Sequence, residues 1–498
     1  MRETISCISD RPAGVPWWRW IANISLIHWV ALLLLTALAF WVRARFLEGP
    51  MRYDEAFTVW RYARNEPMEL IADYSLPNNH VFHTLLVHVG IEIGGIHPDV
   101  VRMPAFAAGV LMVPTGFLAV SRFAGYTAGL FTAALITGSS LLVDYSANAR
   151  GYTMAAGLSL LALGLITELR RGHLPRWSTR SIIAVSGVVG ALGLWTVPIF
   201  AYPWAALLVW LAAPNPWRSG ARRIIDAAVV GAVSMVGALL LYSPIILDRG
   251  LDALIQNRFI VSTSPIAVVE TIPEFLLDVG RMWSHNMPGV LVALVAGGFV
   301  FSLWMPRGPE ARRLSWSIVL GVVTVHLAIH APTPPRVWTV LLPLALAASS
   351  SALGWLYDRT NVSDRGHQSV GAILAIGAAL LMVVNVLQAE GNLSGENDGL
   401  VDAESIALDL ASKITESDYV AAVGESTAPL RYYFELHNLP TGALRQPEQL
   451  PDEIFVVTYG AQSLAGVLEA VGVTETGIES RAVSEYASGS LWSVDLGA

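Results

Sequence analysis

The chain has 498 residues, of which 54% are hydrophobic and 14% charged, and its mean hydropathy is +0.53. A soluble domain usually carries about 25% charged residues, so this composition excludes an ordinary soluble protein. The formal net charge of −8 does not describe one surface, because positive and negative residues are segregated along the chain. The single cysteine, Cys7, excludes an internal disulfide and a cysteine-based metal cluster.

The first 21 residues are charged and lack the short apolar run and cleavage site of a removed signal peptide. We expect residues 1–21 to be a cytoplasmic N-terminal segment. Apolar runs of roughly 17 to 25 residues follow, each long enough to cross a bilayer as a helix. Helices explain these runs better than a barrel does. The predicted spans are 22–46, 100–121, 124–143, 151–168, 181–197, 199–213, 224–245, 286–304, 315–331, 336–356 and 369–388.

The apolar stretch 79–96 is ambiguous, because it also carries His80, His83, His88 and Glu92. These side chains spread over about half of a helical wheel, which disfavours a lipid-facing span but suits an interfacial or re-entrant helix. The short arginine-rich loops should face the cytoplasm. They do so only if 79–96 stays at the outer face, and we predict that it does. The loops lie at 170–180, 218–223, 307–313 and 359–365.

The resulting transmembrane domain covers residues 22–388, and its outer loop 47–99 carries the acidic pair Asp54 and Glu55 in "RYDEAFTVWRYA". Such a pair could simply cap an interfacial helix, because acids favour helix N-termini. The topology favours a functional role instead, because further polar clusters are expected on the same side.

Three such clusters follow in chain order. "SLPNNHVFHTLL" places His80 and His83 on one helical face, where they could bind a metal or a phosphate or be structural. "LLVDYSANARGYTM" brings Asp144 and Arg150 to the junction of two spans, although an aspartate at a helix end is usually a cap. In "HAPTPPRVWTV", three prolines hold Arg336 at the end of a short loop. Its planar fork suits phosphate, but it could also reach toward lipid headgroups.

The segment after the last span is different in kind. Residues 389–401 read as a polar linker, and residues 402–498 are long enough for one small α/β extracytoplasmic domain. Strands are predicted at 418–424, 453–460 and 490–497, and helices at 402–414 and 461–471. No Gly-rich phosphate loop occurs there. A stabilising or acceptor-positioning role is therefore the favoured interpretation.

Acids, imidazoles and arginines at one membrane surface suit a reaction on a lipid-linked phosphate. When a sugar leaves a polyprenyl phosphate, the leaving group is already a stable anion, so no strong general acid is required. The reaction needs positive charge on the phosphate and a carboxylate that takes the proton of the acceptor. A lipid donor also explains why the chain has no nucleotide-sugar fold.

Four motifs of the chain resemble those of a known family. "YDEAFT" is similar to the outer-loop acidic motif of GT-C glycosyltransferases, in the branch of protein O-mannosyltransferases and lipid A aminoarabinose transferases. "PNNHVFHTLL" resembles the His-Pro-Pro-Leu or Lys-Pro-Pro-Leu motif of that branch, with Asn78-Asn79-His80-Val81 in place of the double proline. "VVRMPAFAAGVL", which contains Arg102, resembles the Arg-Leu-Pro segment, and "DYSANARGYT" the second acidic motif.

The resemblance implies an inverting, polyprenyl-phosphate-sugar-dependent transferase of the bacterial cytoplasmic membrane, with an outer-face active site. Asp54 would be the base, Glu55 would support it, and Asp144 would be a second acidic partner. The resemblance leaves a divalent metal open, with Asp54, His80 and Asp144 as candidate ligands; no other cofactor is expected. The partners implied are the lipid-linked donor, an acceptor protein, lipid or glycan, and the bilayer, without nucleic acid. Candidate substrate-binding residues are Tyr53, Asn79, His80, His83, Arg102, Tyr145, Arg150, Tyr152 and Arg336.

Two rivals belong to other classes. A transporter or flippase of a lipid-linked or anionic substrate would bind with the same charged groups without reacting. Transporters commonly show internal repeats and polar groups near the membrane midplane, whereas here no repeat is visible and the polar clusters sit at span ends. A catalytically silent scaffold that carries the outer domain is the second rival, and in it the acid pair would be dispensable.

Overall fold

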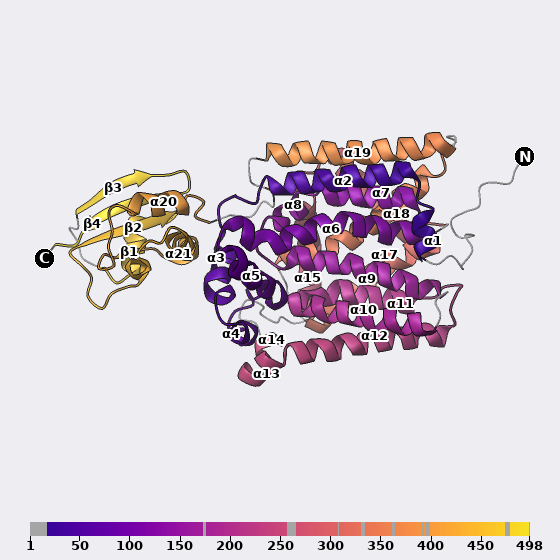
Figure 1. Ribbon diagram of the computed structural model, residues 1–498, viewed down its shortest axis with the longest axis horizontal. Coiled ribbons are helices and arrows are strands. Elements are labelled where there is room, and N and C mark those ends of the chain that lie inside the picture. Colours follow the sequence, from indigo (N-terminus) through magenta and orange to yellow (C-terminus); the bar gives the residue numbers. More distant parts are fainter. Residues whose placement is uncertain are drawn as a thin grey trace, which may run out of the picture.

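The computed structural model describes residues 17–172, 176–255, 265–306, 308–329, 334–360, 364–389, 393, 399–473 and 479–497. Cys7, Arg307 and most of the predicted segments 1–21 and 389–401 therefore lie outside the described residues. Figure 1 shows two parts: a block of long helices, and a smaller α/β part that contains the C-terminus and sits against one end of the block.

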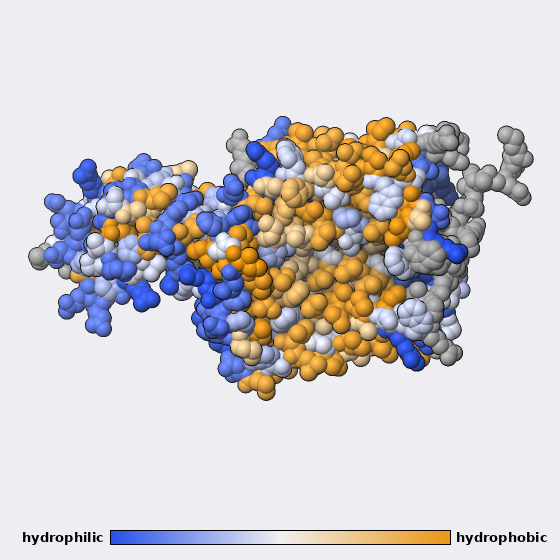
Figure 2. Space-filling model, in the orientation of Figure 1, coloured by the Kyte–Doolittle hydropathy of each residue, from blue (hydrophilic) through white to orange (hydrophobic). Residues whose placement is uncertain are grey.

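Long apolar helices form the block, and hydrophobic side chains cover most of the face of the block that is visible in Figure 2. In the described part of the chain, seven helices are long and apolar enough to cross a membrane, or up to nine if each of two bent pairs is one span. This confirms a polytopic helical membrane fold. The helices of the block are α1 (Trp17–Ala22), α2 (Leu26–Ala44), α6 (Pro98–Ala124), α7 (Tyr126–Gly138), α8 (Ser140–Ser146), α9 (Tyr152–Arg171), α10 (Arg176–Thr196), η3 (Pro198–Phe200), α11 (Ala201–Ala212), α12 (Gly220–Leu241), α16 (Gly289–Trp304), α17 (Pro309–Ile329), η4 (Pro335–Leu341), α18 (Leu342–Tyr357) and α19 (Asp364–Gln388).

Each of the predicted spans corresponds to a helix, but not all of them meet the length of a full span. Helix α11 has 12 residues, and about 20 are needed to cross the hydrocarbon core. The bent pairs are α7–α8, which turns by 61° at Ser139, and α16–α17, which turns by 104°. The bend at Ser139 redirects the chain so that α8 delivers Asp144 to the end of the block.

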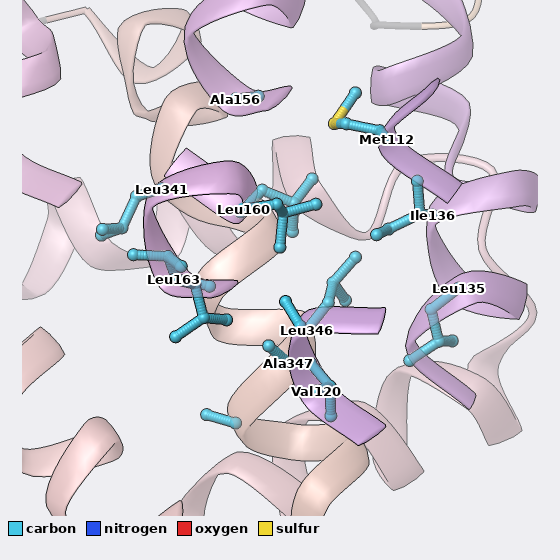
Figure 3. Packing of buried hydrophobic residues seen from close by; sticks show 14 of the residues in the cluster. Met112, Val120, Leu135, Ile136, Ala156, Leu160, Leu163, Leu341, Leu346 and Ala347 are labelled. Atoms are coloured by element: carbon cyan, nitrogen blue, oxygen red, sulfur yellow. The ribbon is translucent and has the colours of Figure 1, made fainter. Parts of the chain in front are cut away.

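The core of the block holds these helices in register. Met112, Ile136, Leu160 and Leu346 come from α6, α7, α9 and α18 and lie together in one cluster (Figure 3). Helices α18 and α7 approach so closely that a Cβ on Gly354 would stand 2.8 Å from the backbone nitrogen of Ala128. Close packing of this kind fixes the ends of α8 and α9, where the polar residues of the site lie.

Short helices cover one end of the block, next to the C-terminal part (Figure 1). Helix α5 has 14 residues, about 21 Å at 1.5 Å per residue, which is too short to cross a bilayer. His80, at its start, lies beside Gly151, and Gly94, at its end, packs on Val100 in the first turn of α6. It therefore begins and ends at the same end of the block. The short helices are α3 (Tyr53–Thr58), η2 (Val59–Ala63), α4 (Pro67–Ala72), α5 (Val81–Gly94), α13 (Ser243–Arg249) and α14 (Asp252–Ile255). Helix α15 (Pro265–Trp283) is longer, with 19 residues, and packs on η4 through Phe275 and Trp338.

The described arginine-rich loops gather at the opposite end. Arg170, at the end of α9, forms an ion pair with Glu310 at the start of α17. The ends of α6 and α9 add the ion pair of Arg122 with Glu168, and the loop before α12 adds that of Arg218 with Asp226. The two ends of the block thus differ in chemistry, with arginine clusters at one end and the acidic motif helix α3 at the other.

The C-terminal part is a four-stranded sheet with helices packed on it. The strand order is β1-β2-β4-β3, with β1 parallel to β2 and the other neighbours antiparallel. The three predicted strands correspond to β1, β2 and β4. Strand β3 and helix α21 were not predicted, because β3 is a polar, largely exposed edge strand and α21 buries its apolar face partly against the helical block. The elements are α20 (Ala403–Leu410), β1 (Val420–Ala421), η5 (Gly424–Ser426), α21 (Thr427–Leu436), η6 (Thr441–Leu444), β2 (Glu453–Tyr459), α22 (Leu464–Ala470), β3 (Glu479–Glu485) and β4 (Gly489–Asp495).

Candidate functional site

Helix α3 presents the predicted acidic pair in its first turn. Arg52 is the N-cap residue, and its backbone N–H donates to the Glu55 carboxylate at 2.9 Å. Carboxylates in the first turn are favoured by the helix dipole. The sequence "RYDE" therefore starts the helix and places Asp54 and Glu55 beside the ends of α6, α8 and α9.

Glu55 is completely buried and fully engaged by protein groups. Its carboxylate accepts hydrogen bonds from the Arg102 guanidinium, including Nε at 3.1 Å, and from the backbone N–H of Ala149 at 2.8 Å. Burial alone would raise the pKa of Glu55, but the charge and hydrogen bonds of Arg102 outweigh it, so the pKa lies below its ordinary value. Glu55 is thus a buried anion that joins α3 to α6 and to the loop before α9.

Arg102 uses its whole guanidinium within the protein. Besides Glu55, it donates to the carbonyl oxygens of Leu47 at 2.7 Å, Gly49 at 2.6 Å and Pro50 at 2.8 Å. A guanidinium has five N–H donors, and Arg102 makes five hydrogen bonds. These contacts fix the backbone that leads into α3 and leave no donor for a substrate.

The two predicted acidic motifs are joined by crossed ion pairs. Arg52 of the first motif binds both oxygens of Asp144 in the second, at 2.8 and 2.5 Å. Arg150 of the second motif pairs with Asp54 of the first, at 2.5 Å. The side chain of Asp144 is 1% exposed, whereas that of Asp54 is 34% exposed. Asp54 is therefore the accessible carboxylate among the three predicted acids.

Arg150 is a buried cation whose hydrogen-bonding capacity is only partly used. Its Nη1 lies 2.5 Å from the Asp54 carboxylate, whereas its Nε has no hydrogen-bond acceptor among the described residues. Burial lowers the pKa of Arg150, but Asp54 and the neighbouring Tyr152 and Tyr145 raise it more, so the net direction is upward. The guanidinium stays charged and holds donors that a further anion could accept.

His80 lies directly against Arg150 and is neutral. Its Nδ1 accepts the backbone N–H of Gly151 at 2.8 Å, so its proton is on Nε2, which lies 3.5 Å from Nη2 of Arg150. Burial, followed by the charge of Arg150 and the neighbouring His83 and Arg336, holds the pKa of His80 well below its ordinary value. His80 is thus a fixed N–H donor rather than a second cation.

His83 lies one turn further along α5 and is completely buried. Both of its ring nitrogens lack a hydrogen-bond partner in the described part of the chain. Burial, and then the charge of Arg150, lower its pKa to about 3. His83 therefore shares the neutral state of His80.

The two asparagines that replace the double proline tie the loop before α5 to its neighbours. The Asn78 amide donates to the backbone oxygen of Asp54 at 3.0 Å. The Asn79 amide donates to the backbone oxygens of Leu70 and Asp73 at 2.9 and 2.8 Å. Asn79 is 1% exposed. These contacts use the amide nitrogen, while the Asn79 Oδ1 has no hydrogen-bond partner among the described residues, and its predicted contact with substrate stays a prediction.

The predicted aromatic residues and Arg336 surround the same cluster. Tyr152 packs edge-on against His80, with ring centroids 4.8 Å apart, and against Tyr145 at 5.1 Å. Tyr53 begins α3 and packs on Phe57. Arg336, in the first turn of η4, is close enough to lower the pKa of His80. The structure therefore brings residues 53–55, 79–83, 102, 144–152 and 336 to one end of the block.

The predicted metal ligands do not form a site suited to a divalent ion. No group of three or more His, Cys, Asp or Glu side chains that could hold a metal occurs among the described residues. Both oxygens of Asp144 are bound by Arg52, and Nδ1 of His80 accepts a backbone N–H. The residues present do not fit a divalent metal in this arrangement.

The sequence alone did not point to Arg52 or Asn78. Arg52 pairs with Asp144, and Asn78 holds the backbone of Asp54. The signal for Arg52 was its position immediately before the acidic motif, because an arginine there can reach a carboxylate on the neighbouring helix end. No local pattern signals Asn78, whose contact depends on how the loop 73–80 folds back over α3.

The fold is similar to that of several solved structures, although no family model matches the sequence. No curated protein matches it either. Among solved structures, ArnT from Cupriavidus metallidurans bound to undecaprenyl phosphate is similar, with a TM-score of 0.62 and 14% identity over 94% of this chain and 98% of that chain. The apo structure of the same protein gives a TM-score of 0.61 and 15% identity over 93% and 97% of the two chains.

A third similar structure is the Archaeoglobus fulgidus oligosaccharyltransferase tethered to an acceptor peptide. Its TM-score is 0.54, with 12% identity over 87% of this chain and 69% of that chain. These structures are GT-C glycosyltransferases, and the likeness extends over both parts of the chain. The chain therefore has the GT-C fold that its motifs predicted.

Proposed function

We propose that this chain, which has the GT-C fold, is a membrane glycosyltransferase that moves a sugar from a polyprenyl-phosphate-linked donor to an acceptor. The observation that carries the proposal is the pairing of Asp54 with Arg150 at the end of the helical block. This pair sets an accessible carboxylate beside a buried cation whose Nε–H has no acceptor among the described residues. An enzyme that must accept a proton from one substrate and stabilise a phosphate on the other needs these two groups side by side.

Asp54 is the proposed base. It is exposed to water on one side, and its ion pair with Arg150 fixes its orientation. The hydrogen bond from Asn78 to its backbone oxygen fixes the turn that carries it. Glu55 and Asp144 are bound on both oxygens by protein groups, so in this proposal they position α3 and Arg52.

The donor phosphate is proposed to lie against Arg150, His80 and Arg336. Arg150 offers its unpartnered Nε–H, and the neutral His80 offers its Nε2–H. Arg336 lies within electrostatic range of His80. Preorganised donors of this kind act where negative charge develops, and in a buried site they are worth more than in water.

The reaction is a single inverting displacement. The acceptor oxygen attacks the anomeric carbon on the face opposite the phosphate and forms the new glycosidic bond. The bond between the anomeric carbon and the phosphate oxygen breaks, and its electron pair stays on the polyprenyl phosphate. The proton of the acceptor passes to Asp54. Hexosyl and pentosyl donors both satisfy this scheme.

We place the site on the outer face of a bacterial cytoplasmic membrane. The described arginine-rich loops lie at the end of the block opposite to α3, and such loops prefer the cytoplasm. The site and the C-terminal part would then be extracytoplasmic. Undecaprenyl phosphate, which is bound to the similar ArnT structure, is the lipid carrier we propose first.

A transporter or flippase is the alternative. The polar cluster argues against it, because the residues lie where α3, α8 and α9 meet at the end of the block, and transporters bind near the midplane. A transporter would also need no base, so it would move the intact donor without releasing polyprenyl phosphate.

The test uses the purified full chain in lipid bilayers with a polyprenyl-phosphate sugar and a panel of acceptors. Release of polyprenyl phosphate is measured for the wild type, for Asp54→Asn and for Asp99→Asn, an exposed acid at the same end of the block. We expect Asp54→Asn to lower turnover by about a thousandfold, because it removes the base, and Asp99→Asn to leave it unchanged. Equal turnover in Asp54→Asn and wild type would refute the base. Movement of the intact donor between leaflets without release would favour the flippase.

A further inference from the structure

Helix α21 of the C-terminal part contacts the acidic-motif helix directly. On one side of α3, Ala56, Val59 and Ala63 belong to the same buried cluster as Leu430 and Phe434 of α21. On the other side, the acids face the helical block through Arg150 and Arg102. The acidic-motif helix and η2 are therefore enclosed between the two parts of the protein.

Two neighbouring tyrosines of α21 fix the chain on both sides of the site. The Tyr433 hydroxyl accepts the backbone N–H of Met51 at 3.0 Å, one residue before Arg52. The Tyr432 hydroxyl donates to the carbonyl oxygen of Ile96, in the loop that leads into α6 and Arg102. Both side chains are nearly completely buried, at 1% and 2% exposure. These buried hydrogen bonds hold the segments that supply Arg52 and Arg102.

Charged contacts extend the same interface along η2. Glu435 pairs with Arg64, and the Arg431 guanidinium lies 4.3 Å from the centroid of the Trp60 ring. These contacts are more exposed than the tyrosine hydrogen bonds, so they contribute less to the position of the backbone.

We propose that Tyr432 and Tyr433 are positioning residues of the active site, so that the C-terminal part is required for sugar transfer although it supplies no catalytic residue. Tyr433 fixes Met51, and through it the N-cap Arg52, which binds Asp144 and Glu55. A shift of α3 would move Asp54 relative to Arg150. Misplacement by about 1 Å can cost about a hundredfold in rate. This inference rests on the function proposed above.

The test compares tyrosine-to-phenylalanine variants of the full chain. Tyr433→Phe and Tyr432→Phe each remove one hydroxyl from the interface. Tyr459→Phe is the matched control, because the Tyr459 hydroxyl donates to Glu425 within the C-terminal part. Hydrogen–deuterium exchange of residues 51–58, and of residues 95–102 for Tyr432→Phe, reports the position of the contacted segments without any substrate, and thermal unfolding in detergent reports whether each variant is folded.

We expect faster exchange of the Met51 and Ala56 amides in Tyr433→Phe. We also expect a kcat lower by about ten- to a hundredfold with KM for the donor within about twofold, because the base is misplaced while the phosphate contacts remain. Tyr459→Phe should match the wild type in both measurements.

Unchanged exchange in Tyr433→Phe and Tyr432→Phe would overturn the contact, and faster exchange with unchanged kcat would overturn the positioning role. A wild type without transfer would overturn the proposed function, while exchange would still test the interface. If Tyr433→Phe does not fold, the Tyr432→Phe variant decides in its place.

Discussion

Two arginines at opposite ends of helix α9 are both buried and both paired with a carboxylate, but they have different roles. Arg170 lies in the last turn of the helix, and Arg150 lies just before its start. Each forms an ion pair with a carboxylate, Glu310 for Arg170 and Asp54 for Arg150. Their side chains are 1% and 5% exposed. Sequence and burial alone would not separate them.

The hydrogen bonds of Arg170 and Arg150 differ. Arg170 donates to Glu310 and to the carbonyl oxygens at the end of α11, including those of Trp210 and Ala213. These carbonyls have no partner within their helix, so Arg170 caps α11. Nη1 of Arg150 is held by Asp54, but its Nε has no hydrogen-bond acceptor in the described part of the chain. A buried donor without a partner is costly unless a ligand uses it, so the comparison assigns stability to one end of α9 and ligand binding to the other.

The largest expected effect is a loss of transfer activity when Arg150 is changed. Arg150→Gln should lower kcat/KM for the donor by about a thousandfold, because it removes the buried cation from the proposed phosphate site. Its unfolding temperature should fall little, because Asp54 is 34% exposed and its freed charge stays hydrated. Transfer assays and thermal unfolding on the same preparations measure both quantities. An Arg150→Gln variant with full turnover would remove the basis of the comparison.

The second prediction is the reverse effect at the other end. Arg170→Gln should lower the free energy of unfolding by about 3 kcal/mol, because it leaves the buried Glu310 with Arg313 as its one remaining cation among the described residues and leaves the α11 carbonyls without donors. The donor KM of the folded fraction should match that of the wild type. Loss of donor binding in folded Arg170→Gln would show that the two ends are not independent.

A double-mutant cycle on two matched ion pairs sharpens the comparison. Arg52 and Asp144 lie at the site end, and Arg122 and Glu168 lie at the opposite end. Changing each pair singly and together should give coupling energies of about 2 kcal/mol in stability for both. Only the Arg52–Asp144 pair should also show coupling in kcat/KM. Coupling in kcat/KM at both pairs would mean that overall folding, rather than the site, sets the activity.

The sequence predicted which residues lie at the site better than it predicted the ion pairs and hydrogen bonds between them. Apolar length and arginine placement were enough to gather Asp54, His80, Asp144, Arg150 and Arg336 at one end. They could not show that Asp144 is bound on both oxygens while Asp54 remains open, because both are aspartates at helix ends. That difference depends on the crossed pairing of two motifs about 90 residues apart in the chain, which no local pattern encodes.

The same limit applies to residues whose predicted role was substrate binding. Arg102 makes all five of its hydrogen bonds inside the protein, and Asn79 holds two backbone carbonyls. A motif match gives the residue and its place on the chain, but the number of free donors is a property of the folded backbone around it. Helix α21 was missed for a related reason: part of its apolar face is buried by residues more than 300 positions earlier.

The smallest expected effect concerns His83, which lies at the site end with two unpartnered ring nitrogens. Its folded pKa of about 3 lies below the ordinary value of 6.5, so below about pH 6.5 the unfolded chain binds a proton that the folded protein does not. This stability is present above pH 6.5 and is lost as the pH falls toward 3. Between about pH 7 and pH 5 the loss is at most about 2 kcal/mol for this group.

His83→Leu should therefore keep its stability at neutral pH and lose less of it on acidification than the wild type. Leucine has no group to protonate, and it removes two buried nitrogens that have no partner, so the neutral protein is not penalised. His97→Gln, at an exposed position before α6, should show the acid loss of the wild type. Thermal unfolding at the two pH values measures the difference. An equal acid loss in His83→Leu and wild type would mean that His83 is protonated in the folded protein, and a charged imidazole beside Arg150 would then be part of the anion site.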